Sequence, residues 1–326
     1  MTITVTNSTI TDNSTSSQDG FGGGIYSGGT LSVSNSIISG NSSAGEGGGI
    51  DGRYGTITVS YSLISGNNGG NKGGGIDVSF DSTISVTNST ISGNTAVEGA
   101  GIYNNGYDDG PRGSGIVYGS LAITTSTISN NHAFTGGGIY NNGTLSLSHS
   151  TISNNYASDD GGGIYNSSSN GNGSDNQLGV VTVSYSSITG NTAGTAGGGI
   201  YNNADDGGDY SHTVTYEQLG IVTVSHSTIS GNQAHLGGGI YNDGTLTVGN
   251  SIIRLNKAFG IELSSGKFES GKGGGIYNSN SGYATATLDY STIASNFDTP
   301  QEDSTKFIKL DNLVGKFINI GSVVRV

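Results

Sequence analysis

The chain has 326 residues, with 60 glycines and no cysteine, and its formal net charge is −13. The acidic balance argues against a nucleic-acid partner, because phosphate binding needs a face rich in Lys and Arg. The lack of cysteine excludes disulfides and thiolate metal sites, and no apolar run is long enough to insert into a membrane.

Three short phrases recur in a fixed order through residues 1–296. The first phrase is GGGIYN or a variant, built on Ile25, Ile50, Ile76, Ile102, Ile139, Ile164, Ile200, Ile240 and Ile276. The second alternates apolar and hydroxyl residues, as in Thr30–Ser34. The third resembles S-T-I-S-G-N and ends on Asn13, Asn41, Asn67, Asn94, Asn131, Asn155, Asn191, Asn232, Asn256 and Asn296.

This repeat predicts a solenoid. Asn131 and Asn155 are 24 residues apart, which leaves room for three short strands and three turns per repeat. The second phrase has the period of a half-buried strand, yet each strand has too few inward apolar residues to bury a face alone. Stacked repeats build one continuous core. We therefore predict an all-β fold, a right-handed single-stranded parallel β-helix of about ten coils with lateral loop insertions and a non-repeat C-terminal tail.

The first predicted strand, Thr2–Thr6, opens the chain with no capping helix before it. Both ends of a parallel solenoid expose unpaired strand edges, and such an edge pairs readily with another strand. We therefore expect Thr2, Ile3, Thr4 and Val5 to be available for end-to-end assembly.

Two acids interrupt the first phrase. A tyrosine follows the inward isoleucine in most repeats, but Asp51 and Asp77 take its place in two neighbouring ones. Glu46, Lys72 and Glu98 also recur once per repeat, and Arg53 is close in sequence. We expect the two aspartates to face each other about 5 Å apart. The aspartates could act as a general acid and base, bind a cation together with Glu46, or contribute only surface charge with a raised carboxyl pKa.

Three long insertions, 105–120, 167–179 and 203–220, follow the first phrase. They leave from one corner of the coil, so we expect them to gather into a lateral lobe. The loops could be solvent-exposed segments without a ligand, or their acids could bind Ca²⁺ or a sugar. These acids are Asp108, Asp109, Asp175, Asp205, Asp206 and Asp209. Ca²⁺ is the possible cofactor. The sequence contains no dedicated calcium-binding motif and therefore defines no certain metal site. A fourth insertion, 258–272, leaves from a different corner.

Side chains of one kind form columns along the rod. We expect the asparagines to stack as a structural ladder: Asn41, Asn67, Asn94, Asn131, Asn155, Asn191, Asn232 and Asn256. The outward tyrosines either stack on one another or offer a strip that binds sugars. The outward hydroxyls resemble an ice-binding face. The histidines are scattered over several registers and form no metal cluster; His149 and His226 share one register, with two coils expected between them.

The repeat ends at Asn296, and residues 297–326 form a separate tail. We divide the chain into a repeat domain, 1–296, and a C-terminal cap or inter-subunit strand segment, 297–326. The tail either covers the last coil or pairs with the first coil of the next molecule. Its apolar residues are the assembly candidates: Phe307, Ile308, Leu310, Phe317, Ile318, Ile320, Val323, Val324 and Val326.

Two of these phrases resemble the GGAI and FxxN motifs of chlamydial polymorphic outer-membrane proteins and related bacterial β-helix surface proteins. Here they read Gly137-Gly138-Ile139 and Ile128-Ser129-Asn130-Asn131, with Ile in place of Phe. The resemblance implies a bacterial extracellular or cell-surface protein with an adhesive role. Residues 1–30 contain no signal peptide, so this location depends on the repeat type.

We therefore expect a structural or adhesive surface protein, self-assembling end to end into a fibre, and not an enzyme. The alternatives are a carbohydrate- or calcium-binding adhesin with a glycan partner, a polysaccharide-active β-helix enzyme acting through Asp51 and Asp77, and an ice-binding solenoid.

Overall fold

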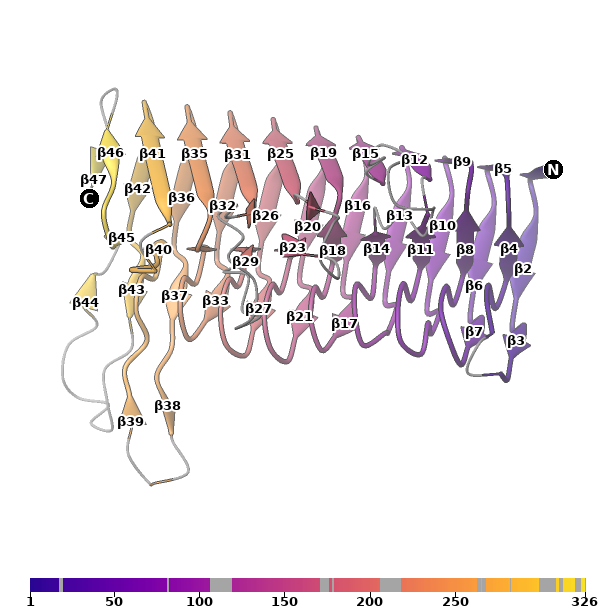
Figure 1. Cartoon of the computed structure of the whole chain (residues 1–326), viewed down its shortest axis with the longest axis horizontal. Helices are drawn as coiled ribbons and strands as arrows, with labels where there is room; N and C mark the ends of the chain where they lie inside the picture. Colours follow the sequence, from indigo (N-terminus) through magenta and orange to yellow (C-terminus); the bar gives the residue numbers. More distant parts are fainter. Residues whose placement is uncertain are drawn as a thin grey trace.

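The computed structural model describes the chain except for residues 18–19, 81, 106–118, 171–175, 178, 206–217, 263–264, 266–267, 282, 299–308, 311–312, 320–323 and 326. The described residues form a rod of stacked coils, with the N-terminus at one end and the C-terminal tail at the other (Figure 1). Within those residues the secondary structure is all strand, and no helix is long and apolar enough to cross a membrane.

Each coil adds one strand to each of three large parallel sheets, which confirms the right-handed parallel β-helix. The first sheet is built on the TLTVS-like phrase and runs through β1 (Thr2–Thr6), β5 (Thr30–Ser34), β9 (Thr56–Ser60), β12 (Thr83–Thr87), β15 (Ser120–Thr124), β19 (Thr144–Ser148), β25 (Val180–Ser184), β31 (Ile221–Ser225), β35 (Thr245–Gly249), β41 (Thr285–Asp289) and β46 (Ile318–Asn319).

The second sheet is built on the STIS-like phrase and runs through β2 (Thr9–Thr11), β6 (Ile37–Ser39), β10 (Leu63–Ser65), β13 (Thr90–Ser92), β16 (Thr127–Ser129), β20 (Thr151–Ser153), β26 (Ser187–Thr189), β32 (Thr228–Ser230), β36 (Ile252–Arg254), β42 (Thr292–Ala294) and β47 (Val324–Arg325). The third sheet is built on the IYN-like phrase and runs through β4 (Ile25–Ser27), β8 (Ile50–Arg53), β11 (Ile76–Ser79), β14 (Ile102–Asn105), β18 (Ile139–Asn142), β22 (Ile164–Asn166), β28 (Ile200–Asn202), β34 (Ile240–Asn242), β40 (Ile276–Asn278) and β45 (Leu313–Val314).

A fourth sheet, which the three-strand prediction missed, follows the asparagine of the third phrase. Its strands have two residues each: β17 (His132–Ala133), β21 (Tyr156–Ala157), β27 (Thr192–Ala193), β33 (Gln233–Ala234), β37 (Lys257–Ala258), β43 (Phe297–Asp298) and β44 (Lys309–Leu310). The short pair β3 (Ser14–Thr15) and β7 (Ser42–Ser43) occupies the same place in the first coils. In most of these strands the inward side chain is a buried alanine.

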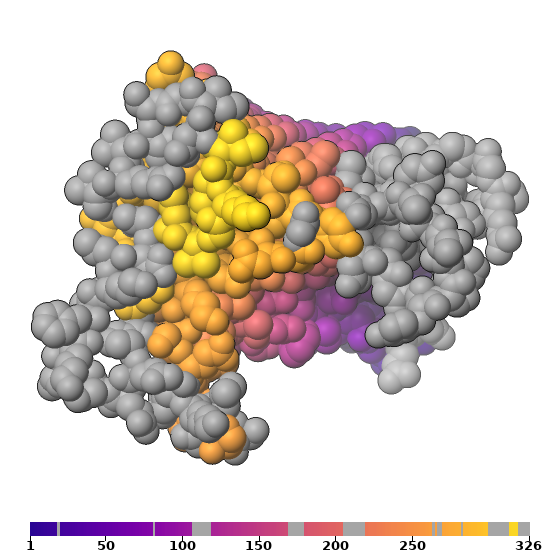
Figure 2. All heavy atoms as spheres, turned by 60° about the vertical axis from the view of Figure 1, so that its left-hand side comes forward, coloured from indigo at the N-terminus to yellow at the C-terminus, as the bar shows by residue number. Residues whose placement is uncertain are grey.

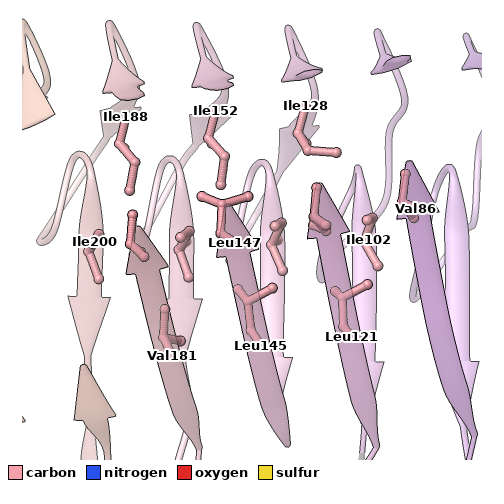
Figure 3. Close-up of a cluster of buried hydrophobic side chains, with 14 of the residues drawn as sticks. Val86, Ile102, Leu121, Ile128, Leu145, Leu147, Ile152, Val181, Ile188 and Ile200 are labelled. Atoms are coloured by element: carbon pink, nitrogen blue, oxygen red, sulfur yellow. The ribbon is translucent and has the colours of Figure 1, made fainter. Parts of the chain in front are cut away.

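Like residues stack on like residues in the core. Ile64 pairs in register with Ile91, and the inward Ile, Leu and Val side chains of the middle coils have almost no exposed surface. Figure 3 shows Ile152 of the second sheet and Leu145 and Leu147 of the first pointing into one interior. Burying each such side chain contributes about 1.5–3 kcal/mol, so the continuous core dominates the stability of the rod.

The predicted asparagine ladder is present. Asn94 illustrates it: its Nδ2 donates to Oδ1 of Asn131 at 2.9 Å and to the carbonyl of Ile64 at 3.2 Å. Its backbone N–H also donates to Oδ1 of Asn131, at 3.0 Å. The pattern continues from Asn13 to Asn296. The ladder therefore satisfies buried turn groups that water cannot reach.

The third sheet holds a second ladder that the sequence analysis overlooked. The inward asparagines of the IYN phrase bond from coil to coil, with Nδ2 donating to the next Oδ1: Asn104, Asn141, Asn166, Asn202, Asn242 and Asn278. Strand alternation could have revealed it, because the residue two after an inward isoleucine also points inward.

The described part of the tail adds strands to the last complete coil of its own chain. β45, β46 and β47 pair in parallel with β40, β41 and β42, while β44 pairs antiparallel with β43. Phe317 packs against the end of the core. Figure 2 shows described C-terminal residues, in yellow, on the orange coils of that end.

Candidate functional site

Asp51 and Asp77 lie on neighbouring strands of the third sheet, β8 and β11. They pair in register, and Asp77 pairs on its other side with Tyr103 of β14. Glu46, Lys72 and Glu98 form a matching series of parallel bridges. The spacing in the sequence thus placed these groups correctly on adjacent coils.

The alternative of surface charge was wrong about exposure, because Asp51 and Asp77 are completely buried, whereas the raised carboxyl pKa that it included agrees with the structure. Arg53 lies across Asp51, with its Nε 2.9 Å from Oδ1 and its Nη2 3.2 Å from Oδ2. The guanidinium carbon of Arg53 lies 3.6 Å from the centre of the Phe21 ring and 5.3 Å from that of Phe80. Outward-facing acids are buried here because neighbouring side chains close over them.

Glu46 connects this cluster to the surface. Its Oε2 accepts a hydrogen bond from Nη2 of Arg53 at 2.5 Å, and its Oε1 lies 3.4 Å from Nζ of Lys72. The side chains of Glu46 and Lys72 remain 23% and 32% exposed, so they border the cluster on its solvent side. Lys72 also lies over the ring of Tyr103, 5.0 Å from its centre.

Burial dominates the electrostatics of the cluster. It raises the pKa of Asp51 to about 6, although Arg53 opposes the shift. Burial and then the charges on Asp51 and Glu46 raise the pKa of Asp77 well above its usual range. Burial also raises the pKa of Glu98. These groups therefore resist carrying their full negative charge unless a positive partner is close.

The geometry gives little support to a polysaccharide-cleaving site. A glycosidase needs both carboxyl groups to reach the scissile bond. Asp77 is completely buried, and Arg53 occupies both oxygens of Asp51. A sugar ring cannot contact either group without displacing the side chains that cover them.

The tyrosines of the third sheet form the predicted stack. Neighbouring ring centres are 4.8–5.4 Å apart along Tyr103, Tyr140, Tyr165, Tyr201, Tyr241 and Tyr277. Sugars stack on the faces of aromatic rings, but each inner ring of this column already covers the faces of its neighbours. The column therefore supports the stacking interpretation and not a sugar-binding strip.

The lateral insertions leave from one corner, as predicted, because all three connect the third sheet to the first. Two begin as antiparallel hairpins, β23 (Ser169–Asn170) with β24 (Asn176–Gln177) and β29 (Ala204–Asp205) with β30 (Gln218–Leu219). The acids Asp108, Asp109, Asp175, Asp206 and Asp209, expected in these loops, lie outside the described residues. The fourth insertion leaves from the fourth sheet and forms a hairpin of β38 (Ile261–Glu262) and β39 (Phe268–Glu269) (Figure 1).

The outward hydroxyls stack in register on the first sheet, as Thr4 on Ser32 illustrates. Thr4 is exposed, so this face is available to a ligand, and ice binding stays a prediction.

The predicted spacing of two histidines was wrong. One coil lies between His149 and His226, and the ring of Tyr185 stacks between them at 5.2 and 4.8 Å.

A known family model matches a short segment of the chain. The profile of the Chlamydia polymorphic membrane protein repeat matches residues 149–167. This segment contains Ile152-Ser153-Asn154-Asn155 and Gly162-Gly163-Ile164, one copy of each motif behind the resemblance. The resemblance is thus confirmed for one copy of the repeat, and it indicates a bacterial surface or outer-membrane type of protein. Searches of curated proteins and of solved structures gave no significant match.

Proposed function

We propose that this chain is an extracellular structural element of a bacterial surface, a rigid rod that assembles head to tail with further copies of itself. The observation that carries the proposal is the order of strands. Each large sheet begins with an open edge strand of the first turn, β1, β2 or β4, and ends with a strand of the tail, β46, β47 or β45. Parallel pairing across the two ends would continue all three sheets into the next molecule.

The first coil of the described residues packs against another coil on one side only. Ile3, Val5 and Ile10 are only partly buried, whereas Leu31 and Val33 on the next coil are fully buried. An open strand edge beside exposed apolar side chains favours pairing with another strand. This end therefore gains buried area when a further coil is added.

The tail offers side chains in the matching register. Phe317 lies directly before Ile318, which pairs with Thr287. When the register is followed from strand to strand through the first sheet, Ile318 takes the same position as Thr4. Phe317 therefore takes the same position as Ile3. A simple translation along the rod would thus stack Phe317 of one copy on Ile3 of the next. Such a contact does not close, so it propagates into a fibre.

Electron microscopy of negatively stained protein tests this assembly. Ten coils at about 4.8 Å each give a single rod of roughly 50 Å, and we expect long filaments of that unit. Ile3→Lys removes the apolar contact and places a charge near Lys316, which is exposed in the tail. The variant should give single short rods. Its matched control, Ile252→Lys, changes a 41% exposed isoleucine on the side of the rod and should leave filaments intact.

Circular dichroism must show that both variants keep the β fold. Phe317→Ser is a further variant that weakens the same contact from the tail side. Short single rods for the unsubstituted protein at all concentrations would rule out head-to-tail assembly. Filaments of Ile3→Lys as long as those of the control would rule out the proposed interface.

A carbohydrate- or calcium-binding adhesin is the second candidate, favoured by hairpins β23–β24 and β29–β30, which project from one corner of the rod. A glycan array probed with the whole chain tests it. Binding that is lost when 167–179 and 203–220 are replaced by short turns would support adhesion. No binding to any glycan would count against carbohydrate recognition.

A further inference from the structure

The buried cluster on the third sheet contains an oxygen atom without a partner. Oδ1 of Asp77 accepts a hydrogen bond from Oγ of Ser79 at 2.8 Å, but Oδ2 has no hydrogen-bond partner among the described residues. The side chain is completely buried, so bulk water does not satisfy this oxygen. A buried acceptor left in this state is costly, and it indicates that a group is missing from its surroundings.

The charges around Asp77 are also unbalanced. Four carboxyl groups from the described residues interact in this region, those of Glu46, Asp51, Asp77 and Glu98. Among the described residues, two cationic side chains interact with them, Arg53 and Lys72. Four negative and two positive charges leave a difference of two negative charges when all groups are ionised. Buried charge without compensation is strongly unfavourable.

Three of the carboxylates converge geometrically. One oxygen from each of Glu46, Asp51 and Asp77 lies within 4.8 Å of the other two. Oxygens bound to one Ca²⁺ at about 2.3–2.6 Å are separated by at most about 5 Å, so a single ion can contact all three. Arg53 does not prevent this, because a carboxylate oxygen that accepts one hydrogen bond keeps a second lone pair.

We propose that Glu46, Asp51 and Asp77 bind one divalent cation, of the oxygen-coordinated Ca²⁺ class, which links the adjacent coils of β8 and β11. The donors are all oxygen, as hard cations require, and they include no nitrogen or sulfur ligand. Ca²⁺ suits the site better than Mg²⁺, because it accepts irregular geometry and loses its water more readily. The partly exposed side chains of Glu46 and Lys72 mark the side from which the ion enters.

Calorimetric titration of the whole chain with CaCl₂, after removal of metal with EDTA, tests the site. We expect Asp77→Asn to bind one equivalent less than the unsubstituted chain, because the amide keeps the shape and the bond to Ser79 but cannot replace the carboxylate. Asp160→Asn changes a partly buried acid elsewhere on the rod and is the matched control. It should keep the full stoichiometry. Any Ca²⁺ bound by the lateral insertions is common to all three proteins and cancels in this comparison.

A thermal melt gives a second reading. The melting temperature of the unsubstituted chain should rise by several degrees between EDTA and excess CaCl₂, and that of Asp77→Asn should rise less, with circular dichroism confirming its fold. Glu46→Gln should weaken the affinity at least tenfold. Equal stoichiometry and affinity for Asp77→Asn and the unsubstituted chain would overturn the proposal. The absence of any Ca²⁺ uptake would also overturn it, and would leave a proton as the neutralising partner.

Discussion

Two parts of the third sheet have the same backbone register but different chemistry. From β14 to β40, each strand carries an outward tyrosine and an inward asparagine, and both stack on their own kind. In β8 and β11 the outward positions hold Asp51 and Asp77, and the inward positions hold Gly52 and Val78. The regular part is satisfied by its own repetition. In the irregular part, Arg53 pairs with Asp51 and packs against Phe21, and the cation proposed above would supply further positive charge. Identity along a column therefore provides stability, whereas a departure from it relies on contacts with other groups.

The largest effect should follow from breaking the regular part. Asn155→Ala removes the acceptor of the side chain and backbone N–H of Asn131 and the donor to the carbonyl of Ile128. Each buried group left unpaired costs about 1–3 kcal/mol, so we expect roughly 3–5 kcal/mol of lost stability in urea denaturation. Ser146→Ala, on the exposed face of β19, should change stability by less than about 0.5 kcal/mol. Similar small losses for both variants would refute the ladder's contribution.

A glycine in the irregular part should be almost as sensitive. A Cβ on Gly52 would lie 1.8 Å from Cδ1 of Ile57. The Cδ1 methyl group of Ile57 therefore fills the space that an asparagine side chain occupies in later coils. Gly52→Ala should cost about 1–3 kcal/mol through overpacking. Gly249→Ala is the control, because nothing lies within 4 Å of its added Cβ. A neutral Gly52→Ala would show that the core of this coil can rearrange.

Interrupting the aromatic column should have a smaller effect. Tyr201 stacks on Tyr165 and Tyr241 at 4.9 and 4.8 Å, and Tyr201→Leu removes both ring contacts while keeping an apolar side chain. We expect a loss of about 1–2 kcal/mol. Tyr26→Leu should cost less, because Tyr26 is 49% exposed and only tilts against Phe21. Equal losses would mean that the stacked rings of the column add no stability.

The smallest predicted effect depends on pH. Burial and the neighbouring charge of Asp159 raise the pKa of Asp160 from 3.8 to about 7, against a hydrogen bond from the N–H of Ala196. An acid with a raised pKa in the folded state destabilises the fold when ionised, so its cost is absent below pH 4 and complete above pH 7. Asp160→Asn should therefore add about 1 kcal/mol at pH 8 and nothing at pH 3.5. The same gain at both pH values would contradict this assignment.

The sequence was sufficient to predict the three large sheets, the first asparagine ladder, the tyrosine stack and the pairing of Asp51 with Asp77, because each depends on position within a repeat. It was not sufficient to predict that these aspartates are buried. Arg53, the last residue of β8, bonds to Asp51, and its guanidinium packs against Phe21, which precedes β4, and Phe80, which follows β11. Alternation predicts which face a side chain occupies, but it cannot predict how far the neighbouring turns close over that face.

Head-to-tail assembly, the central claim, can be tested by disulfide trapping, since the chain has no cysteine of its own. Thr4 and Ile318 occupy the same register of the first sheet, and strands about 4.8 Å apart place paired Cα atoms within the range of a disulfide. Mixing Thr4→Cys with Ile318→Cys under mild oxidation should yield reducible heterodimers. Mixing Ser146→Cys with Ile318→Cys should not. Equal heterodimer yields from the two mixtures, or none from either, would contradict the proposed contact.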